Sequence, residues 1–196
     1  MGSTPEIRTE RLLLRRFAAE DAEAFFRLMS SDEVNRFLPV LPFKKIQEAE
    51  KYLLENYITT YENPVGFRYA VCLKSDNVPI GYAAVSDSDN YDLGYGLSRE
   101  YWHNGIITEA CGAVIEEVRK SGIPYITATH DVNNPRSGAV MKKIGMSYRY
   151  SYEELWQPKN ILVLFRMYQL NLDGNHGRVY RGYWNKYPVH FVEEGV

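Results

Sequence analysis

Two short segments contain the residues whose types and spacing are suited to holding a ligand. The first runs from Tyr95 to Ala110, where a predicted strand passes through a loop containing Asn104 and Gly105 and continues at once into a predicted helix. The start of a helix offers unpaired N–H groups and the positive end of the helix dipole. Such a turn can bind a diphosphate through its main chain, without a lysine. A tight turn at Gly105 is an equally simple explanation of the same residues.

The second segment runs from Asn133 to Ser137 and leads into a short predicted helix. Asn134 suits the N-cap and Pro135 the first helical position, so helix capping alone explains these residue types. A functional interpretation requires the Asn134 amide and the Ser137 hydroxyl to face a ligand at the end of the preceding strand. Open α/β sheets tend to bind ligands at that place. Neither segment decides the function by itself.

Three side chains are candidates for a general base. His130 ends a predicted strand, and imidazole titrates near neutrality. A histidine at a strand end is also often only a hydrogen-bonded structural residue. Glu153 and Glu154, on the penultimate predicted strand, are weaker alternatives because surface carboxylates are usually only solvated. A chain of water molecules is a further candidate.

Hydrophobic periodicity predicts the elements that must position these residues. The chain opens as strand, helix, helix, continues as an antiparallel meander, and then alternates strand and helix before two final strands. This order favours an α/β (α+β) fold with a mixed, mostly antiparallel central sheet of about seven strands and four helices. The predicted strands cover residues 11–17, 67–73, 80–86, 92–98, 125–130, 146–156 and 161–170, and the helices cover 22–29, 46–61, 108–120 and 135–144.

The chain changes character after Leu172. We expect residues 1–172 to form one catalytic domain and residues 173–196 to form an aromatic-rich C-terminal extension. Exposing so many aromatic rings to water is unfavourable, so we expect the extension to dock on the domain or on a partner subunit. A docked extension can shape the mouth of a substrate site.

Composition excludes several classes of function. The 196 residues are 45% hydrophobic and carry a net charge of -2, which gives no electrostatic reason to expect nucleic acid or an anionic membrane as a partner. No apolar run approaches the roughly 20 residues of a membrane span, so a cytoplasmic location is expected. The two cysteines, Cys72 and Cys111, suit reduced, buried thiols better than a disulfide or a metal site, and no metal is expected.

Taken together and in order, these segments resemble the GNAT superfamily of N-acetyltransferases, in particular the group that includes the bacterial ribosomal-protein N-terminal acetyltransferases. The resemblance covers roughly Thr9 to Asn171. It rests on the opening Thr-Glu-Arg-Leu-Leu-Leu-Arg at 9–15, the loop Tyr-Trp-His-Asn-Gly-Ile-Ile-Thr-Glu-Ala at 101–110, and the segment from Asn-Pro-Arg-Ser at 134–137 to Lys-Ile-Gly-Met at 143–146.

The resemblance implies acetyl-CoA as the cosubstrate. It implies that a β-bulge splays the strand ending near Ser98 away from the strand ending near His130, and that the pantetheine arm lies in the gap. The main chain of residues 103–108 would cradle the pyrophosphate, while Asn134 and Ser137 would meet the pantetheine and thiol end. The implied cofactor-binding residues are Leu97, Ser98, His103, Asn104, Gly105, Ile106, Ile107, Thr108, Asn134 and Ser137.

The resemblance also implies direct attack of a neutral amine on the thioester. The backbone N–H of Leu97 is then the candidate donor to the oxyanion, and His130 the candidate base. Family members often place a tyrosine acid where this chain has Met141, so Ser137, or a water that it holds, is the expected substitute. Members usually carry glycine at the position of His103, which makes the phosphate loop more crowded here or brings the imidazole to the phosphate.

Several alternatives remain open at this stage. The acceptor amine is either a protein N-terminus, which favours an acidic open groove, or a small molecule, which favours a closed aromatic-lined pocket. A non-catalytic coenzyme-A-binding regulatory or interaction module is the alternative from another class. A dinucleotide or ATP site at Gly105 is disfavoured because the loop lacks the Gly-x-Gly-x-x-Gly and Gly-Lys-Ser/Thr spacings. The sequence is compatible with a homodimer.

Overall fold

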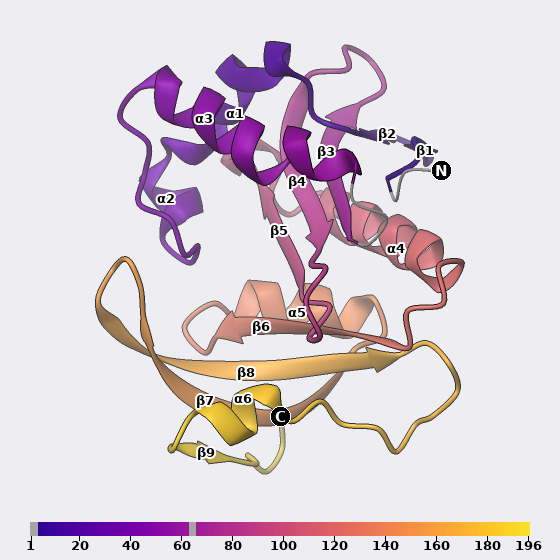
Figure 1. The fold of residues 1–196 in the computed structure, drawn as a ribbon, viewed down its shortest axis with the longest axis vertical. Helices are drawn as coiled ribbons and strands as arrows, with labels where there is room; N and C mark the ends of the chain where they lie inside the picture. Colours follow the sequence, from indigo (N-terminus) through magenta and orange to yellow (C-terminus); the bar gives the residue numbers. More distant parts are fainter. Residues whose placement is uncertain (1–3, 63–65) are drawn as a thin grey trace.

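Two antiparallel sheets meet edge to edge in the computed structural model, which describes residues 4–62 and 66–196 (Figure 1). The first sheet has the order β1-β2-β3-β4-β5 and the second has the order β6-β8-β7-β9. The strands are β1 (Ile7–Arg8), β2 (Leu12–Arg15), β3 (Phe67–Leu73), β4 (Pro79–Val85), β5 (Leu93–Leu97), β6 (Tyr125–Asp131), β7 (Ser147–Trp156), β8 (Ile161–Asn171) and β9 (His190–Phe191).

Helices cover both faces of the first sheet. Leu12 and Leu14 of β2 face one core, shared with α4, whereas Leu13 between them faces a second core shared with α1 and α3. Alternate side chains of a strand point to opposite faces, so three successive leucines serve two cores. The helices are α1 (Ala22–Met29), α2 (Asp32–Asn35), α3 (Ile46–Asn56), α4 (Ile106–Arg119), α5 (Pro135–Lys143) and α6 (Gly182–Lys186).

The two sheets touch at one point and then diverge. Asp92 and Thr127 form an isolated parallel bridge at the start of β5 and β6. Beyond that bridge the two strands separate, and α4 and α5, which follow them, lie at the open end. The splayed strands agree with the expectation from the sequence.

The chain after residue 172 packs on the second sheet. Its short helix α6 and strand β9 lie against β7, and β9 extends the sheet by pairing with Ser151 and Tyr152. Val179, Tyr180 and Trp184 pack on a small core that β7 and β8 supply. The aromatic extension is therefore part of the folded molecule.

The α/β fold with mostly antiparallel sheets is confirmed, with three corrections. The central sheet is divided in two, because β5 and β6 share only one bridge. The predicted β-bulge is absent from β5, whose register with β4 is regular from Leu93 to Leu97. Helix α3 ends at Asn56, and residues 58–62 form a 3-10 turn. No helix of the described ranges is long and apolar enough to cross a membrane.

Candidate active site

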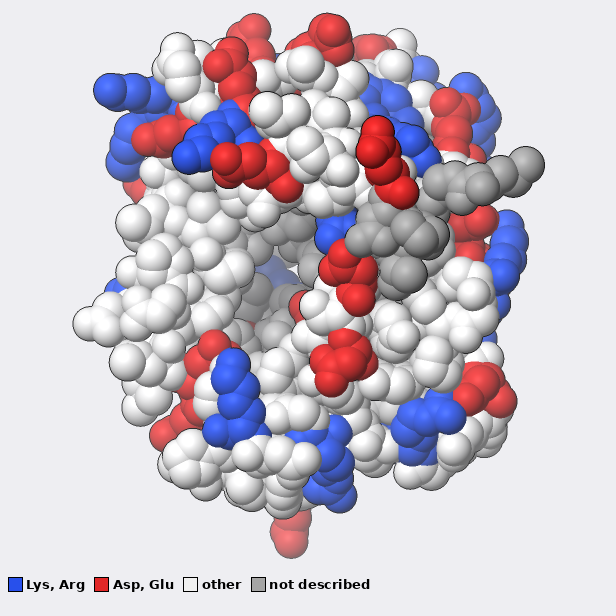
Figure 2. Space-filling model, in the orientation of Figure 1, with Lys and Arg blue, Asp and Glu red and all other residues white. Residues whose placement is uncertain are grey.

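A cavity of about 1130 Å³ lies where the two sheets diverge. Figure 2 shows the surface hollowed between the part that carries α1 and α3 and the part that carries β7 and α6. One end of the cavity is lined by β5, the start of α4 and α5, and the other end by β7, β8, α2 and α6. We call these the α4 end and the α6 end.

The start of α4 presents free N–H groups to the cavity. Glu109 makes the first helical hydrogen bond, from its N–H to the Gly105 carbonyl at 3.0 Å. The N–H groups of Ile106, Ile107 and Thr108 precede that bond and have no helical acceptor. Gly105 is the N-cap, with a left-handed φ of 73°. The helix begins two residues earlier than predicted, because Ile106 is buried in the core below.

The opening motif of the chain braces this loop. Arg11 donates from Nη1 to the Asn104 carbonyl at 2.9 Å and from Nε to Glu109 at 2.7 Å. Thr9 donates its hydroxyl to the other Glu109 oxygen at 2.6 Å. These bonds and that of the Arg11 N–H lower the pKa of Glu109, although partial burial opposes the shift. The motif therefore holds the start of α4 in place, although Arg11 and Glu109 are 98 residues apart in sequence.

His103 occupies a backbone position that favours glycine. Its φ is 64°, in the left-handed region, where a side chain is strained by roughly 1–2 kcal/mol. This geometry gives a physical reason for the glycine that the resemblance in sequence implies at this position. The His103 side chain is exposed and lines the α4 end of the cavity.

The backbone of Leu97 faces the opening between β5 and β6. Ser98 donates its N–H to the Ile80 carbonyl of β4 at 2.8 Å, and neighbouring residues of a strand point their backbone groups to opposite sides. The N–H and carbonyl of Leu97 therefore point away from β4, as do those of Tyr95. The Leu97 carbonyl accepts from the Trp102 indole at 2.7 Å, and its N–H is directed to the cavity.

Two of the predicted cofactor residues have other roles within the described structure. Ser98 uses its N–H for β4 and its carbonyl for the N–H of Tyr101, and it does not line the cavity. Asn104 gives its carbonyl to Arg11 and its amide to Trp102. The predicted site residues that do line the cavity are Leu97, His103, Gly105, Ile106, Ile107, Thr108, His130, Asn134 and Ser137.

Ser137 is hydrogen-bonded to Tyr95, a residue for which the sequence indicated no role. The hydroxyls of Ser137 and Tyr95 lie 2.9 Å apart, and Tyr95 also lies within hydrogen-bond distance of the Ser137 carbonyl. Burial raises the pKa of Tyr95, so the phenol stays protonated and able to donate. Asn134 caps α5 by accepting the Ser137 N–H at 3.4 Å, as helix capping predicts. Met141 is buried.

His130 lies under α5. Its Nδ1 donates to the Asp131 carbonyl at 2.8 Å, so Nε2 carries the lone pair. Nε2 is buried without a partner among the described residues, and a Cβ placed on Gly138 would lie 2.6 Å from it. Burial lowers the pKa of His130. The ring touches the cavity, but its free nitrogen faces the helix backbone, which favours a structural role.

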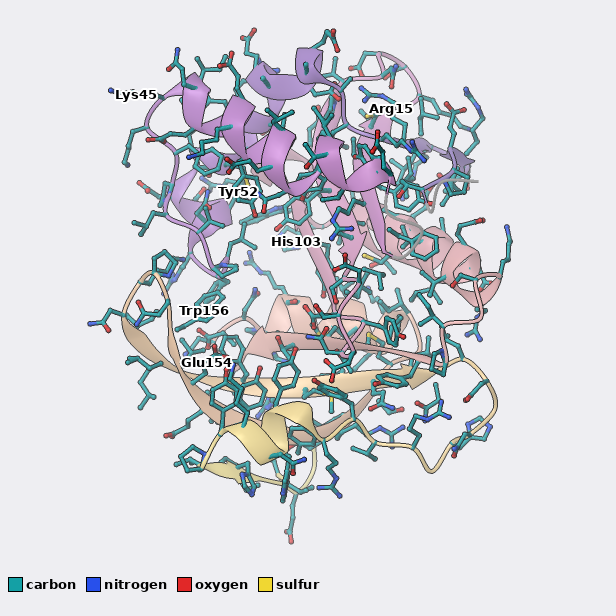
Figure 3. The ribbon with its side chains drawn as sticks, in the orientation of Figure 1. Arg15, Lys45, Tyr52, His103, Glu154 and Trp156 are labelled. Atoms are coloured by element: carbon teal, nitrogen blue, oxygen red, sulfur yellow. The ribbon has the colours of Figure 1, made fainter. Side chains whose placement is uncertain are left out.

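Asp92 and Glu154 are carboxylates at the α6 end. Both are half-buried and line the cavity. Glu153 does not line it. Burial raises the pKa of Asp92 to about 7, opposed only by a weak contact with the Thr127 hydroxyl. Figure 3 shows Glu154 and Trp156 together on β7, on one side of the opening, with His103 across from them. Asp92 carries no motif that reveals it in the sequence.

A splayed pair of strands with a helix start at the open end is typical of proteins that bind a phosphate-bearing ligand, and the comparisons identify the family. Residues 11–147 match the family model described as acetyltransferase (GNAT) domain. This match covers more than half of the chain. The protein therefore belongs to the GNAT acetyltransferase family.

Relatives and solved structures agree with this assignment. The chain is 27% identical to the uncharacterized N-acetyltransferase YoaA of Bacillus subtilis, over 72% of this chain and 82% of that protein. A GNAT-family acetyltransferase from Bacillus anthracis has the same fold, with a TM-score of 0.76, 22% identity, and coverage of 86% of this chain and 99% of the other. The ribosomal L7/L12 alpha-N-protein acetyltransferase RimL, solved with coenzyme A, has a TM-score of 0.76 at 17% identity, covering 87% and 100%.

Proposed function

We propose that this protein transfers the acetyl group of acetyl-CoA to a primary amine by direct attack of the amine on the thioester. The observation that carries the proposal is the cavity between β5 and β6, which has the free N–H groups of α4 at one end and carboxylates at the other. The first end suits a phosphate-bearing cosubstrate. The second end suits an amine.

The residues at the α4 end fit acetyl-CoA. The main chain of Ile106, Ile107 and Thr108 would hold the pyrophosphate, because its N–H groups have no helical acceptor. Gly105 adds no side chain to that loop, and even a Cβ at this position would come no closer to a neighbouring side chain than 3.7 Å, from Arg11 Nη2. The open edge of β5 at Leu97 would pair with the pantetheine arm. Bound there, acetyl-CoA supplies an activated acyl carbon.

Leu97 and Ser137 would assist the transfer. The N–H of Leu97 points to the cavity and would donate to the oxygen on which negative charge develops, the position where such donors contribute most. The Ser137 hydroxyl would give a proton to the departing sulfur, and its hydrogen bond with the Tyr95 hydroxyl would orient it. Tyr95 thus acts as a positioning residue.

We propose Asp92 as the group that takes up the amine proton. Its pKa of about 7 suits a general base at neutral pH. Asp92 lies three residues from Tyr95 and five from Leu97, about 10 Å and about 17 Å along the strand. The proton would therefore reach Asp92 through solvent in the cavity. His130 is a less suitable base, because its free nitrogen faces α5.

Residues 1–172 would then form the catalytic domain, and residues 173–196 an extension that completes the α6 end. Tyr183, Lys186 and Tyr187 of the extension line the cavity. The extension would thus contribute to the acceptor side and leave the cosubstrate side unchanged.

Calorimetric titration with acetyl-CoA, combined with a thiol-release assay over a panel of amines, tests the proposal. Gly105→Val forces a β-branched side chain into a φ of 73° and should weaken acetyl-CoA binding by about tenfold or more. Gly112→Ala, in the middle of α4 with open space around it, is the matched control and should bind normally.

Saturable binding together with amine-dependent thiol release supports the transferase. Binding with no release on any amine supports the non-catalytic coenzyme-A module. Equal binding by the Gly105→Val variant and the native chain would contradict the placement of the pyrophosphate at α4.

A further inference from the structure

Aromatic side chains from two parts of the chain build a wall at the α6 end of the cavity. The ring of Tyr152 on β7 lies parallel to those of Tyr183 and Tyr187, with centroids 4.9 Å away in each case and interplanar angles of 9° and 10°. Phe165 of β8 stacks on Tyr152 at 5.6 Å. All four line the cavity. Tyr152 and Phe165 are buried, so Tyr183 and Tyr187 present the accessible part of this wall, with Lys186 Nζ 4.9 Å from the centroid of the Tyr187 ring. Such a wall suits a flat apolar group.

Among the charged side chains that line the cavity, the basic ones and Glu33 are exposed, whereas three carboxylates are half-buried. The basic ones, Arg36, Arg136, Lys143 and Lys186, are exposed to solvent. Asp92, Asp131 and Glu154 are half-buried within the same cavity. Charges shielded from water act more strongly on a ligand than charges in solvent. The inner surface is therefore negative and favours a cation.

The α6 end is bridged on two sides. Lys159, in the turn between β7 and β8, donates its ammonium to the carbonyls of Asn35 and Arg36 at α2. On another side, the Tyr183 hydroxyl accepts from the Asn90 amide at 2.8 Å, which links the extension to the loop before β5. These two bridges join the sheets across the cavity and restrict access for a large ligand.

We propose that the acceptor is a small, positively charged amine with a flat apolar ring, and that Tyr183 and Tyr187 of the extension select it. The ring lies against the tyrosine wall, and the ammonium group is attracted by the half-buried carboxylates. The proposal rests on the transferase function proposed above and names its substrate class. A protein N-terminus fits less well, because the bridges at Lys159 and Tyr183 narrow the access to the α6 end.

Thiol release by the full chain, measured with three amines, tests this assignment. Phenethylamine carries a ring, hexylamine is a straight chain of similar size, and a serine-initiated tripeptide represents a protein N-terminus. We expect kcat/KM for phenethylamine to exceed that of the other two by about tenfold or more, the discrimination that one well-fitted apolar contact gives.

Variants of the wall separate selection from catalysis. Tyr183→Ala and Tyr187→Ala should each lower kcat/KM for phenethylamine by about tenfold and leave the KM for acetyl-CoA unchanged. Tyr183→Phe keeps the ring and loses only the bond to Asn90, so it should keep the preference over hexylamine. Phe191→Ala is the control, because Phe191 belongs to the extension but is exposed and lies outside the cavity lining.

Two outcomes would overturn the assignment in distinguishable ways. If hexylamine or the tripeptide is acetylated as well as phenethylamine, or if both alanine variants keep the preference, the pocket assignment fails while the transferase stands. If no amine releases thiol although calorimetry shows that acetyl-CoA binds, the transferase proposal fails and the substrate class fails with it.

Discussion

Asp92 is the residue whose ionisation we expect to determine how activity depends on pH. Burial raises its pKa to about 7, and the proposed role requires the ionised form. We therefore expect log kcat/KM to rise with pH and to level off above about 7. Asp92→Asn should remove that inflection and lower activity at pH 8 by about 100-fold, within the range for loss of a general base. A pH–rate profile measures both effects.

Glu153→Gln is the matched control for this experiment, because Glu153 lies outside the cavity lining. Its profile should follow that of the native protein. Stability gives a second readout. Because the folded pKa of Asp92 is about 7 and its ordinary value is 3.8, the native protein should lose stability as pH rises from about 4 to about 7 and change little above that. The Asp92→Asn variant should therefore melt higher than the native protein, by more at pH 8 than at pH 5; an equal difference at the two pH values would contradict the burial of this carboxylate.

Sequence patterns found some of the residues at the site and could not find others. Gly105 and Ser137 belong to local motifs, in which a helix start is visible from residue types alone. Tyr95 and Asp92 are different, because their roles depend on which face of β5 they occupy and on what α5 and the extension bring to them. Ser98 adjoins Leu97 in sequence but faces β4, and only the hydrogen-bond register distinguishes the two.

At the scale of elements, the contact of α5 with β6 depends on the missing side chain of Gly138. A Cβ there would lie 2.6 Å from Nε2 of His130. We expect Gly138→Ala to lower the free energy of unfolding by about 1–3 kcal/mol, the usual effect of overpacking. In a His130→Ala background the same change should have a smaller effect. Urea denaturation of the four proteins measures this coupling.

Gly112→Ala on α4 is the comparison, because its Cβ would meet open space. That change should leave stability unchanged or raise it by up to about 1 kcal/mol, since alanine favours a helix more than glycine does. If Gly138→Ala lowers the free energy of unfolding equally in the native protein and in the His130→Ala variant, His130 does not determine the spacing of α5 and β6.

Two elements are predicted to the residue. Periodicity predicts a helix over 22–29 and a strand over 67–73, and α1 and β3 cover the same residues. The elements β1, β9 and α2 are two to four residues long and leave no such pattern. β9 forms where the chain pairs with β7, which is distant from it in sequence. A local pattern does not contain such a contact.

At the scale of the whole molecule, one ion pair holds the end of the extension on the second sheet. Arg166 of β8 donates from Nε and Nη2 to the two Glu193 oxygens at 3.0 and 2.5 Å, and Ser151 also bonds to this carboxylate. Glu193→Gln should lower the free energy of unfolding by about 1–3 kcal/mol, because it weakens a half-buried, charge-assisted contact. It should also speed proteolysis after residue 172.

Urea denaturation and limited proteolysis measure these two effects. Glu194→Gln is the control, since Glu194 is exposed. The Arg166 guanidinium lowers the pKa of Glu193, so the native contact should persist below the ordinary pKa of glutamate and be lost only at lower pH. Unchanged proteolysis of the Glu193→Gln variant would mean that the aromatic contacts alone hold the extension.

The tyrosine wall is supplied in part by one contiguous segment near the end of the chain, whereas the α4 end is built from Thr9, Arg11 and residues 97–137. Mutations in that segment can therefore alter the choice of amine without disturbing the proposed acetyl-CoA site. The part of such a molecule that binds acetyl-CoA can thus be retained in evolution while the part that recognises the amine changes. Exchanging residues 173–196 between relatives should then transfer the preference for an amine.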